Sequence, residues 1–249
     1  MDTPATRIPE SLVETLRNAQ SVAVLTGSGI SVESGVPTFR DAQTGLWARY
    51  EPTELATPEA FARDPRLVWR WYVWRRELVE GASPNPGHEA LAELERHVPE
   101  FVLVTQNVDG LHRRAGSQRV KELHGNIQRS KCSVEGTAIE PREDDLEIPP
   151  SCPSCGAFLR PDVVWFGEML PAGGLKEAFE AARGCDLFFS VGTSSLVQPA
   201  ASLPFEALRN GVVIAEVNPN DTPLTRHAEY ALQGRAGEVL PALVGAAYG

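Results

Sequence analysis

The sequence VAVLTGSGISVESGVPTFR, residues 22–40, begins with an apolar run and continues into a loop of small residues. A short run rich in valine before glycines predicts a buried strand that ends in a tight turn. Glycines let the backbone approach a phosphate, and the N–H groups of such a turn bind anions. We therefore expect a nucleotide pyrophosphate here. The spacing of Gly27, Gly29 and Gly35 departs from G-x-G-x-x-G, so the ordinary dinucleotide-binding fingerprint matches only weakly.

Length and composition are those of an ordinary globular protein. A chain of 249 residues, 42% of them hydrophobic, can bury a large core in one domain or two. The net charge of −10 argues against sequence-independent binding to nucleic acid, which needs a basic face, but a basic peptide remains an acceptable partner. We expect neither a secretory signal nor a membrane span, and hence a cytoplasmic protein without a membrane partner.

Apolar runs alternate with helical patterns along the chain. The alternation predicts an α/β fold, in which a parallel sheet carries helices on both faces. The expected strands are residues 22–25, 101–104, 163–165, 187–191 and 212–217, and the expected helices are residues 11–19, 87–96, 174–183 and 200–210. Ligands of such sheets bind beyond the carboxyl ends of the strands. Three polar loops fall there, at residues 27–29, 106–107 and 192–195.

Two segments interrupt this alternation. Residues 46–84 are helical and rich in Trp and Arg, and residues 126–160 contain three of the four cysteines. We expect both segments to be insertions that form a smaller lobe. The fourth cysteine, Cys185, precedes a predicted strand and is most simply a small buried residue.

The three clustered cysteines have the spacing of a zinc site. Cys152 and Cys155 are two residues apart, as in a zinc knuckle, and Cys132 lies where a partner knuckle would begin. The position three residues after Cys132, where a fourth cysteine would be expected, holds Glu135. Three thiolates and a carboxylate could hold zinc, although a carboxylate is a harder ligand and weakens the site. A redox pair and a knuckle without metal are the alternatives.

Several motifs follow one another in a fixed order along most of the chain. They are GSGIS at 27–31 with PTFR at 37–40, TQNVDGLH at 105–112, HG at 124–125, VWFGE at 164–168 and GTSS at 192–195. Together they resemble the sirtuins, a family of NAD-dependent protein-lysine deacylases. Two positions depart from the family pattern: Ser28 stands where alanine is usual, and Glu135 stands where a zinc-ligand cysteine is usual.

The resemblance implies a Rossmann-like large domain and a smaller lobe, with NAD and the substrate peptide in the cleft between them. The large domain would comprise residues 1–45, 85–125 and 161–249. The small lobe would comprise a helical insertion, residues 46–84, and a zinc-ribbon-like module, residues 126–160, with Cys132, Cys152, Cys155 and Glu135 as the metal ligands. Acylated protein lysines would be the partners, and we expect a monomer.

The resemblance also assigns catalytic residues. In the family's chemistry the acyl oxygen attacks C1′ of the nicotinamide ribose, nicotinamide leaves, and a base activates the ribose hydroxyls. An imidazole suits this base because its pKa lies near 7. His124 occupies the matching position, and a structural loop histidine is the alternative. Asn107 and Asp109 are expected beside the nicotinamide ribose and carboxamide; an Asx turn or a helix cap is their alternative.

Further residues are assigned by the same resemblance to binding. The expected NAD-binding set is Gly27, Ser28, Gly29, Ile30, Ser31, Thr38, Phe39, Arg40, Trp47, Gln106, Asn107, Val108, Asp109, Gly192, Thr193, Ser194, Asn218 and Ala236. The segment Val164, Trp165, Phe166 and Gly167 is expected to pair its backbone with the substrate peptide. Trp165 and Phe166 could instead be ordinary core residues.

The tryptophan-rich helix carries a feature that bears on the acyl group. Tyr72 and Arg75 are three residues apart and share one helical face, and none of the helical neighbours of Arg75 is acidic, whereas Arg76 can pair with Glu80. An arginine beside aromatic residues suits a carboxylate from elsewhere. Tyr-x-x-Arg here resembles the sirtuins that remove succinyl, malonyl or glutaryl groups, and Ala56 matches the small residue that leaves room for the longer chain.

The sequence is also compatible with other functions. Aromatic residues at helical spacing usually pack a core, so a plain NAD-dependent lysine deacetylase with incidental Tyr72 and Arg75 is one alternative. A protein mono-ADP-ribosyltransferase would have similar motifs, and a regulatory module could sense NAD without turnover. Nicotinamide release that depends on an acyl-peptide separates the deacylases from such a sensor.

Overall fold

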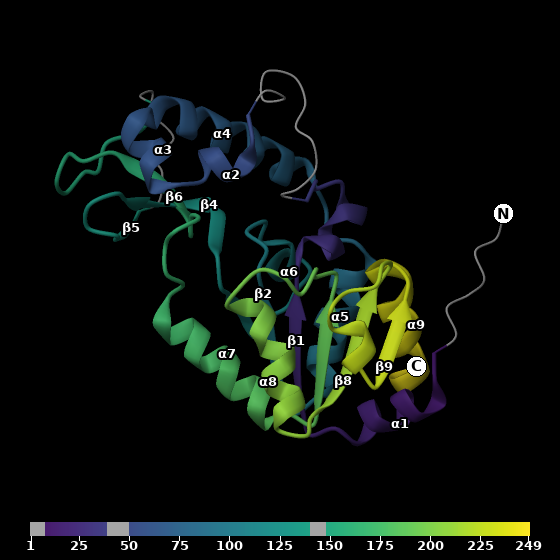
Figure 1. Cartoon of the computed structure of the whole chain (residues 1–249). Helices are drawn as coiled ribbons and strands as arrows, with labels where there is room; N and C mark the ends of the chain where they lie inside the picture. The colour runs from purple at the N-terminus through teal and green to yellow at the C-terminus, as the bar shows by residue number, and fades with distance from the viewer. Residues whose placement is uncertain (1–7, 39–49, 140–147) are drawn as a thin grey trace.

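The computed structural model describes residues 8–38, 50–139 and 148–249, and Figure 1 shows their arrangement. The strands are β1 Ser21–Thr26, β2 Glu100–Thr105, β3 Val120–Glu122, β4 Gly125–Cys132, β5 Ala138–Ile139, β6 Leu159–Val163, β7 Leu187–Val191, β8 Val213–Asn218 and β9 Tyr230–Gln233. The α-helices are α1 Glu10–Asn18, α2 Pro52–Leu55, α3 Pro58–Arg63, α4 Pro65–Gly81, α5 Pro86–His97, α6 Leu111–Arg114, α7 Ala172–Gly184, α8 Leu203–Arg209 and α9 Ala236–Tyr248. Short 3₁₀ helices are η1 Ser28–Ser34, η3 Ala200–Ser202 and η4 Thr225–His227.

The larger sheet is parallel and has six strands in the order β3-β2-β1-β7-β8-β9. The strand order reverses between β1 and β7, because the chain moves outward from β1 to one edge and then returns beside β1 to build the other half. Open α/β sheets bind their ligands at such a switch point, outside the carboxyl ends of the strands. This arrangement confirms the predicted Rossmann-like α/β class.

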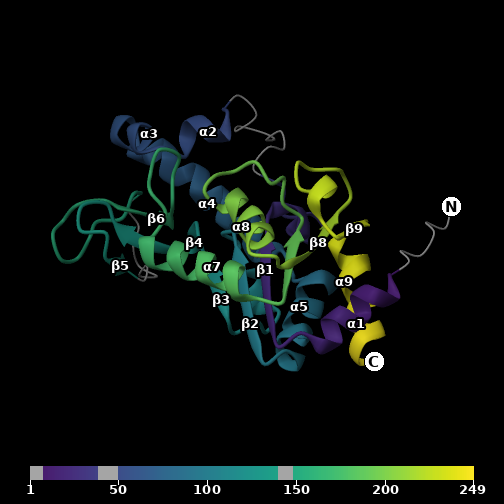
Figure 2. The same ribbon diagram turned by 60° about the horizontal axis from the view of Figure 1, so that its bottom comes forward.

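Both faces of this sheet are covered by helices, which explains why its strands are continuous apolar runs. Val22 and Val24 of β1 face a core built with α1, α5 and α9. Their neighbours Ala23 and Leu25 face the opposite core, which α7 and α8 complete. Figure 2 shows the two groups of helices on either side of the sheet. Cys185 is buried in the second core, as predicted.

The three helices of the helical insertion, α2, α3 and α4, each begin with a proline, and so does α5 after it. Thr57 caps α3 by accepting a hydrogen bond from Ala60 N at 3.1 Å, and Asp64 caps α4 through Leu67 N at 3.0 Å. Asn85 caps α5 in the same way. A polar cap followed by proline is a strong start signal, since proline lacks the N–H that the first turn cannot bond. The predicted Trp-rich helix is therefore α4.

The second sheet has three antiparallel strands in the order β5-β4-β6. Figure 1 shows this sheet with α2, α3 and α4 above the carboxyl ends of the larger sheet. The expectation that residues 163–165 add a strand to the parallel sheet is wrong: β6 ends at Val163 and pairs with β4. An apolar run identifies a buried segment but not its partner strand.

One helix boundary and two short strands also differ from the sequence expectations. Residues 200–210 are a 3₁₀ turn followed by α8 rather than one helix, because Pro204 suits only the first turn of a helix. The short strands β3 and β9 were not predicted.

No helix in the described part of the chain has both the length and the apolar character needed to cross a membrane.

Candidate active site

The glycine loops after β1 and β7 lock into each other at the switch point. Gly29 N donates a hydrogen bond to Gly192 O at 2.8 Å. A Cβ on Gly29 would lie 2.6 Å from that oxygen, and a Cβ on Gly192, whose φ is +58°, would lie 2.5 Å from Ile30 N. Both contacts are backbone contacts and cannot relax by a side-chain rotation. Here the glycines are therefore required by the close approach of two loops as well as suited to a bound phosphate.

Beneath these loops, three predicted polar side chains form one buried network. Asn107 Nδ2 donates to Gly27 O and to Ser31 Oγ, each at 3.1 Å. Ser31 Oγ donates to Asp109 Oδ2 at 2.8 Å, and Leu111 N donates to Asp109 Oδ1 at 2.9 Å. Burial raises the pKa of the Asp109 carboxyl. Asp109 thus makes the Asx-type turn given as the alternative, and it also contacts the loop that follows β1.

The loop after β7 is held from two neighbouring strands. Gln106 Nε2, following β2, donates to Thr193 Oγ1 at 3.0 Å. Asn218 Nδ2, at the end of β8, donates to Thr193 O at 2.8 Å. The three polar loops expected at the carboxyl ends of the strands therefore lie together, and the predicted NAD-binding residues Gln106 and Thr193 are in direct contact.

His124 follows β3 and contacts the same region. Its Nδ1 lies 2.8 Å from Gln106 O, and because a carbonyl oxygen only accepts, the Nδ1 hydrogen is donated to it. The neutral ring then has its unprotonated nitrogen at Nε2. Burial lowers the pKa of His124, while the bond to Gln106 partly opposes this shift. The arrangement gives a neutral imidazole with a free lone pair at Nε2, which is what a general base needs.

Residues 164–166 connect His124 to the helical insertion. Val164 N donates to His124 O at 2.9 Å, and Phe166 N donates to Ala56 O at 2.9 Å. Trp165 Nε1 donates to Tyr72 OH at 2.9 Å. The structure therefore places the predicted catalytic histidine and the predicted acyl-binding residues on either side of one short segment. The N–H groups of Val164 and Phe166 are thus bonded within the chain, and the pairing of residues 164–167 with a substrate peptide stays a prediction.

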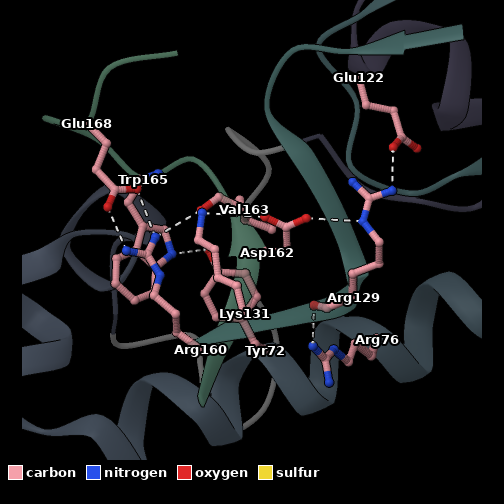
Figure 3. Close-up of polar contacts among 10 residues, drawn as sticks. All are labelled: Tyr72, Arg76, Glu122, Arg129, Lys131, Arg160, Asp162, Val163, Trp165 and Glu168. Atoms are coloured by element: carbon pink, nitrogen blue, oxygen red, sulfur yellow. Dashed lines mark hydrogen bonds and ion pairs between the residues drawn. The ribbon is translucent and has the colours of Figure 1, made fainter. Parts of the chain in front are cut away.

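The predicted acyl-binding pair lies on the inner face of α4. Tyr72 is 3% exposed, and burial raises the pKa of its hydroxyl to about 12. Burial also lowers the pKa of Arg75, whose guanidinium carbon lies 5.3 Å from the centre of the Trp71 ring. Arg76 Nε donates to Ile127 O at 2.6 Å, and its Nη2 donates to Arg129 O at 2.9 Å. Arg76 thus attaches α4 to β4, as Figure 3 shows in part, and the charge of Glu80 also acts on its guanidinium.

The cysteine module has the geometry of two facing knuckles. Cys132 and Cys152 each begin a tight turn that ends in a glycine with positive φ, +68° at Gly136 and +76° at Gly156. One ligand atom from each of the four residues Cys132, Glu135, Cys152 and Cys155 lies within 4.8 Å of the others. Three sulfurs and one carboxylate oxygen at this separation fit a tetrahedral zinc ion. The cluster could therefore hold zinc, with Glu135 in the place of a fourth cysteine.

The remaining predicted NAD-binding residues differ in their surroundings. Phe39, Arg40 and Trp47 lie outside the described residues. Ile30 and Ala236 are buried in the core shared by α5 and α9, whereas Ser28 is exposed. Thr38, Val108 and Ser194 are partly buried. The roles proposed for all of these residues stay predictions.

Two further histidines, to which the sequence assigned no role, lie buried behind the network. His88 Nε2 lies 3.5 Å from Ser31 Oγ, and His112 Nε2 lies 2.9 Å from Thr26 Oγ1. Their rings are 4.8 Å apart, and burial lowers the pKa of His88 to about 4 and that of His112 well below its usual value. A usable signal was present for His88, since Asn-Pro-x-His places a ring nitrogen at the third position of a capped helix.

Sequence reasoning also overlooked the exposed apolar pair Leu196 and Val197. It follows Ser195, which has a φ of +55°. Both side chains lie just after the loop at the carboxyl end of β7, at the edge where the polar loops gather. Their signal in the sequence was an apolar pair directly after the polar GTSS loop.

Comparison with known proteins agrees with this geometry. A family model described as the Sir2 family matches residues 27–199. The NAD-dependent protein deacylase 1 of Pseudomonas aeruginosa is 51% identical over 246 residues, which cover 96% of this chain and 98% of that protein. The NAD-dependent protein deacylase of Aquifex aeolicus is 52% identical over 217 residues, which cover 87% of this chain and 90% of that protein.

Solved structures give the same result. A Sir2 homologue in complex with NAD superimposes with a TM-score of 0.90 at 48% identity, covering 98% of this chain and 95% of that one. A Sir2 protein with a deacetylated p53 peptide and 3′-O-acetyl ADP-ribose gives a TM-score of 0.84 at 31% identity, covering 95% and 97%. The fold and the site define an NAD-binding α/β enzyme of the sirtuin class. The chain belongs to the Sir2 family.

Proposed function

We infer that this chain is an NAD-dependent deacylase of protein lysines, and we propose that it prefers acyl groups that end in a carboxylate. The products would be nicotinamide, O-acyl-ADP-ribose and the free lysine. The observation that carries the proposal is the single short segment, residues 164–166, that joins His124 to Ala56 and Tyr72. It brings a base and an acyl-binding helix to the same end of the sheet.

The deacylation chemistry follows from the groups around His124. We propose that Asn107 and Asp109, fixed by Ser31, hold the nicotinamide end of NAD, and that the interlocked glycine loops hold the pyrophosphate. Nε2 of His124 then accepts a proton from a ribose hydroxyl once nicotinamide has left. NAD supplies the ribose electrophile, and the residues of the chain position it and move the proton.

The preference for an acidic acyl group is supported by α4. Arg75 offers a positive charge beside a tyrosine hydroxyl on a mostly apolar inner surface, where a charge-assisted hydrogen bond is strong. Ala56, also buried there, has a side chain small enough to leave space for a longer acyl chain. A carboxylate at the far end of the acyl group would contact both Tyr72 and Arg75.

The partners proposed are acylated lysines in proteins, bound along Gly167 and the exposed pair Leu196 and Val197. The net charge of −10 supports protein rather than nucleic-acid substrates. We further propose that the enzyme acts as a monomer in the cytoplasm, with a structural zinc at the cysteine module and the two-lobed division expected from the sequence.

The acyl preference is tested with peptides of one sequence that carry acetyl-, succinyl- or malonyl-lysine. Wild-type protein should show the higher kcat/KM on the two acidic acyl groups. Arg75→Met should lower the succinyl-to-acetyl ratio of kcat/KM by about 10–100-fold, the value of a hydrogen bond to a charged group. Arg70→Met, exposed on the same helix, is the matched control and should leave the ratio at the wild-type value. An equal loss on acetyl and succinyl substrates in Arg75→Met contradicts the preference.

A further inference from the structure

The hydrogen bond between Trp165 and Tyr72 has a fixed direction. The indole Nε1–H can only donate, so the Tyr72 hydroxyl must be the acceptor in this 2.9 Å contact. A tyrosine hydroxyl has a single proton to donate. Because the oxygen already receives a hydrogen from Trp165, its own proton has to point away from the indole. Trp165 thus sets the direction in which the Tyr72 hydroxyl donates its hydrogen bond.

The indole itself is held on several sides (Figure 3). The Arg160 guanidinium carbon lies 3.4 Å from the centre of the indole ring, and Arg160 forms a two-bond pair with the Glu168 carboxylate at 2.6 and 2.8 Å. Glu168 also accepts a hydrogen bond from Trp165 N at 2.8 Å. Phe61 lies 5.3 Å from the indole, ring centre to ring centre. Only 2% of Trp165 is exposed, so its ring has little freedom to turn.

The helix that carries Tyr72 is also held in place. Arg76 bonds α4 to two carbonyls of β4, and Tyr72 and Arg75 lie three residues apart on the same face. Both partners of the Trp165–Tyr72 bond are therefore fixed before any substrate arrives. Such a prepared donor is worth more than one that must be ordered on binding.

We propose that Trp165 is a positioning residue for acyl selectivity: its indole N–H occupies the Tyr72 oxygen and so directs the Tyr72 proton to the terminal carboxylate of the acyl chain beside Arg75. The inference rests on the proposed acidic-acyl preference. It gives Trp165, which lies in the segment proposed to bind the peptide, a second role in acyl selectivity. In this account the backbone of the VWFGE segment aligns the substrate peptide, and the tryptophan side chain of the same segment contributes to acyl selectivity.

The protonation of Tyr72 is consistent with this role. Burial raises the pKa of its hydroxyl to about 12, so the group remains a donor over any assay pH. The competing explanation is that Trp165 only fills space between Phe61 and Tyr72. The two explanations differ in what the indole nitrogen does, because a phenyl ring also fills much of that space but donates no hydrogen bond.

A double-mutant cycle on the succinyl-to-acetyl ratio of kcat/KM tests the proposal. Trp165→Phe removes the N–H and keeps an aromatic ring, and it should lower the ratio by about three- to tenfold, the value of one buried hydrogen bond. The loss should appear in KM for the succinyl peptide. Tyr72→Phe should lower the ratio at least as much. In the Tyr72→Phe background, Trp165→Phe should produce no further change, since the residue acts only through the hydroxyl.

Additive losses in the cycle, or an unchanged ratio in Trp165→Phe, overturn the proposal. If Trp165→Phe does not fold, as judged by its melting temperature, Arg160→Met takes its place in the cycle because it releases the indole without removing it. It should lower the ratio in the same direction, and only when Tyr72 is present. Failure of the proposed function itself gives a different result, in which Arg75→Met leaves the ratio unchanged.

Discussion

At the scale of single residues, the hydrogen bond of His124 supports the proposal that this residue is the general base. Its Nδ1–H is engaged by Gln106 O, so Nε2 is the nitrogen that can accept a proton. We predict that His124→Ala lowers acyl-peptide-dependent nicotinamide release by about 10²–10⁴-fold, the usual contribution of a general base. NAD binding, measured by calorimetry, should largely survive. Turnover near the wild-type value in this variant contradicts the assignment.

The same residue predicts a pH dependence. Burial lowers the pKa of His124 below its ordinary value of 6.5. The proposed base works in its neutral form, which predominates above its pKa, so kcat/KM should fall in acidic solution with a midpoint below pH 6.5. A pH profile on one acyl-peptide measures this. A midpoint of the acidic limb above pH 7 would show that the environment raises the pKa instead.

Single residues also show what the sequence could not resolve. The motif singled out Asn107 and Asp109 as candidate site residues, but it did not predict that Ser31 bonds both of them. No role was predicted for His88, or for His112 at the end of the TQNVDGLH motif, although both are buried behind the same network. A buried polar contact depends on which strands are neighbours, and this information is absent from local spacing.

At the scale of elements, the two interlocked loops predict that one added methyl group at Gly29 lowers stability and weakens NAD binding. Gly29→Ala would place a Cβ 2.6 Å from Gly192 O, which is a backbone atom, so the loops must separate. We expect a loss of about 1–3 kcal/mol of unfolding free energy, the usual cost of overpacking, and weaker NAD binding. Gly174→Ala in α7 is the control, because its Cβ meets nothing within 4 Å. Equal stability of the two variants in chemical denaturation contradicts the account of these loops.

The cysteine module gives a second prediction at this scale. Purified without chelators, the protein should contain about one zinc per chain. Cys152→Ser should lose the metal and melt at a lower temperature, because zinc joins the two knuckles and its binding energy contributes to folding. Glu135→Cys should keep the metal and resist chelators better, since thiolate is the softer ligand. A zinc content near zero in wild-type protein contradicts the site.

The elements themselves were predicted well where the pattern is local. The strands β1, β2, β7 and β8 are long apolar runs, and helices such as α4 and α5 begin at a polar cap followed by proline. The strand expected at residues 163–165 failed because its partner is β4, a strand of the other sheet. Apolar runs predict burial, while pairing depends on contacts far apart in the sequence.

At the scale of the whole molecule, the reversal of strand order between β1 and β7 determines where the site lies. It gathers the loops after β1, β2, β7 and β8 at one edge, and the small sheet with α4 stands over that edge (Figure 1). The sequence predicted this class of fold from alternation alone. It could not predict that Trp165 would bond Tyr72 of α4, because that contact joins residues 93 apart in the sequence.

The most direct test is one steady-state experiment with wild-type protein, NAD labelled in its adenosine half, and an acyl-lysine peptide. The account predicts one nicotinamide released for each lysine freed, with label recovered as O-acyl-ADP-ribose and a higher kcat/KM for succinyl than for acetyl peptide. Nicotinamide release that does not depend on the peptide, or transfer of the label to protein without deacylation, would contradict it.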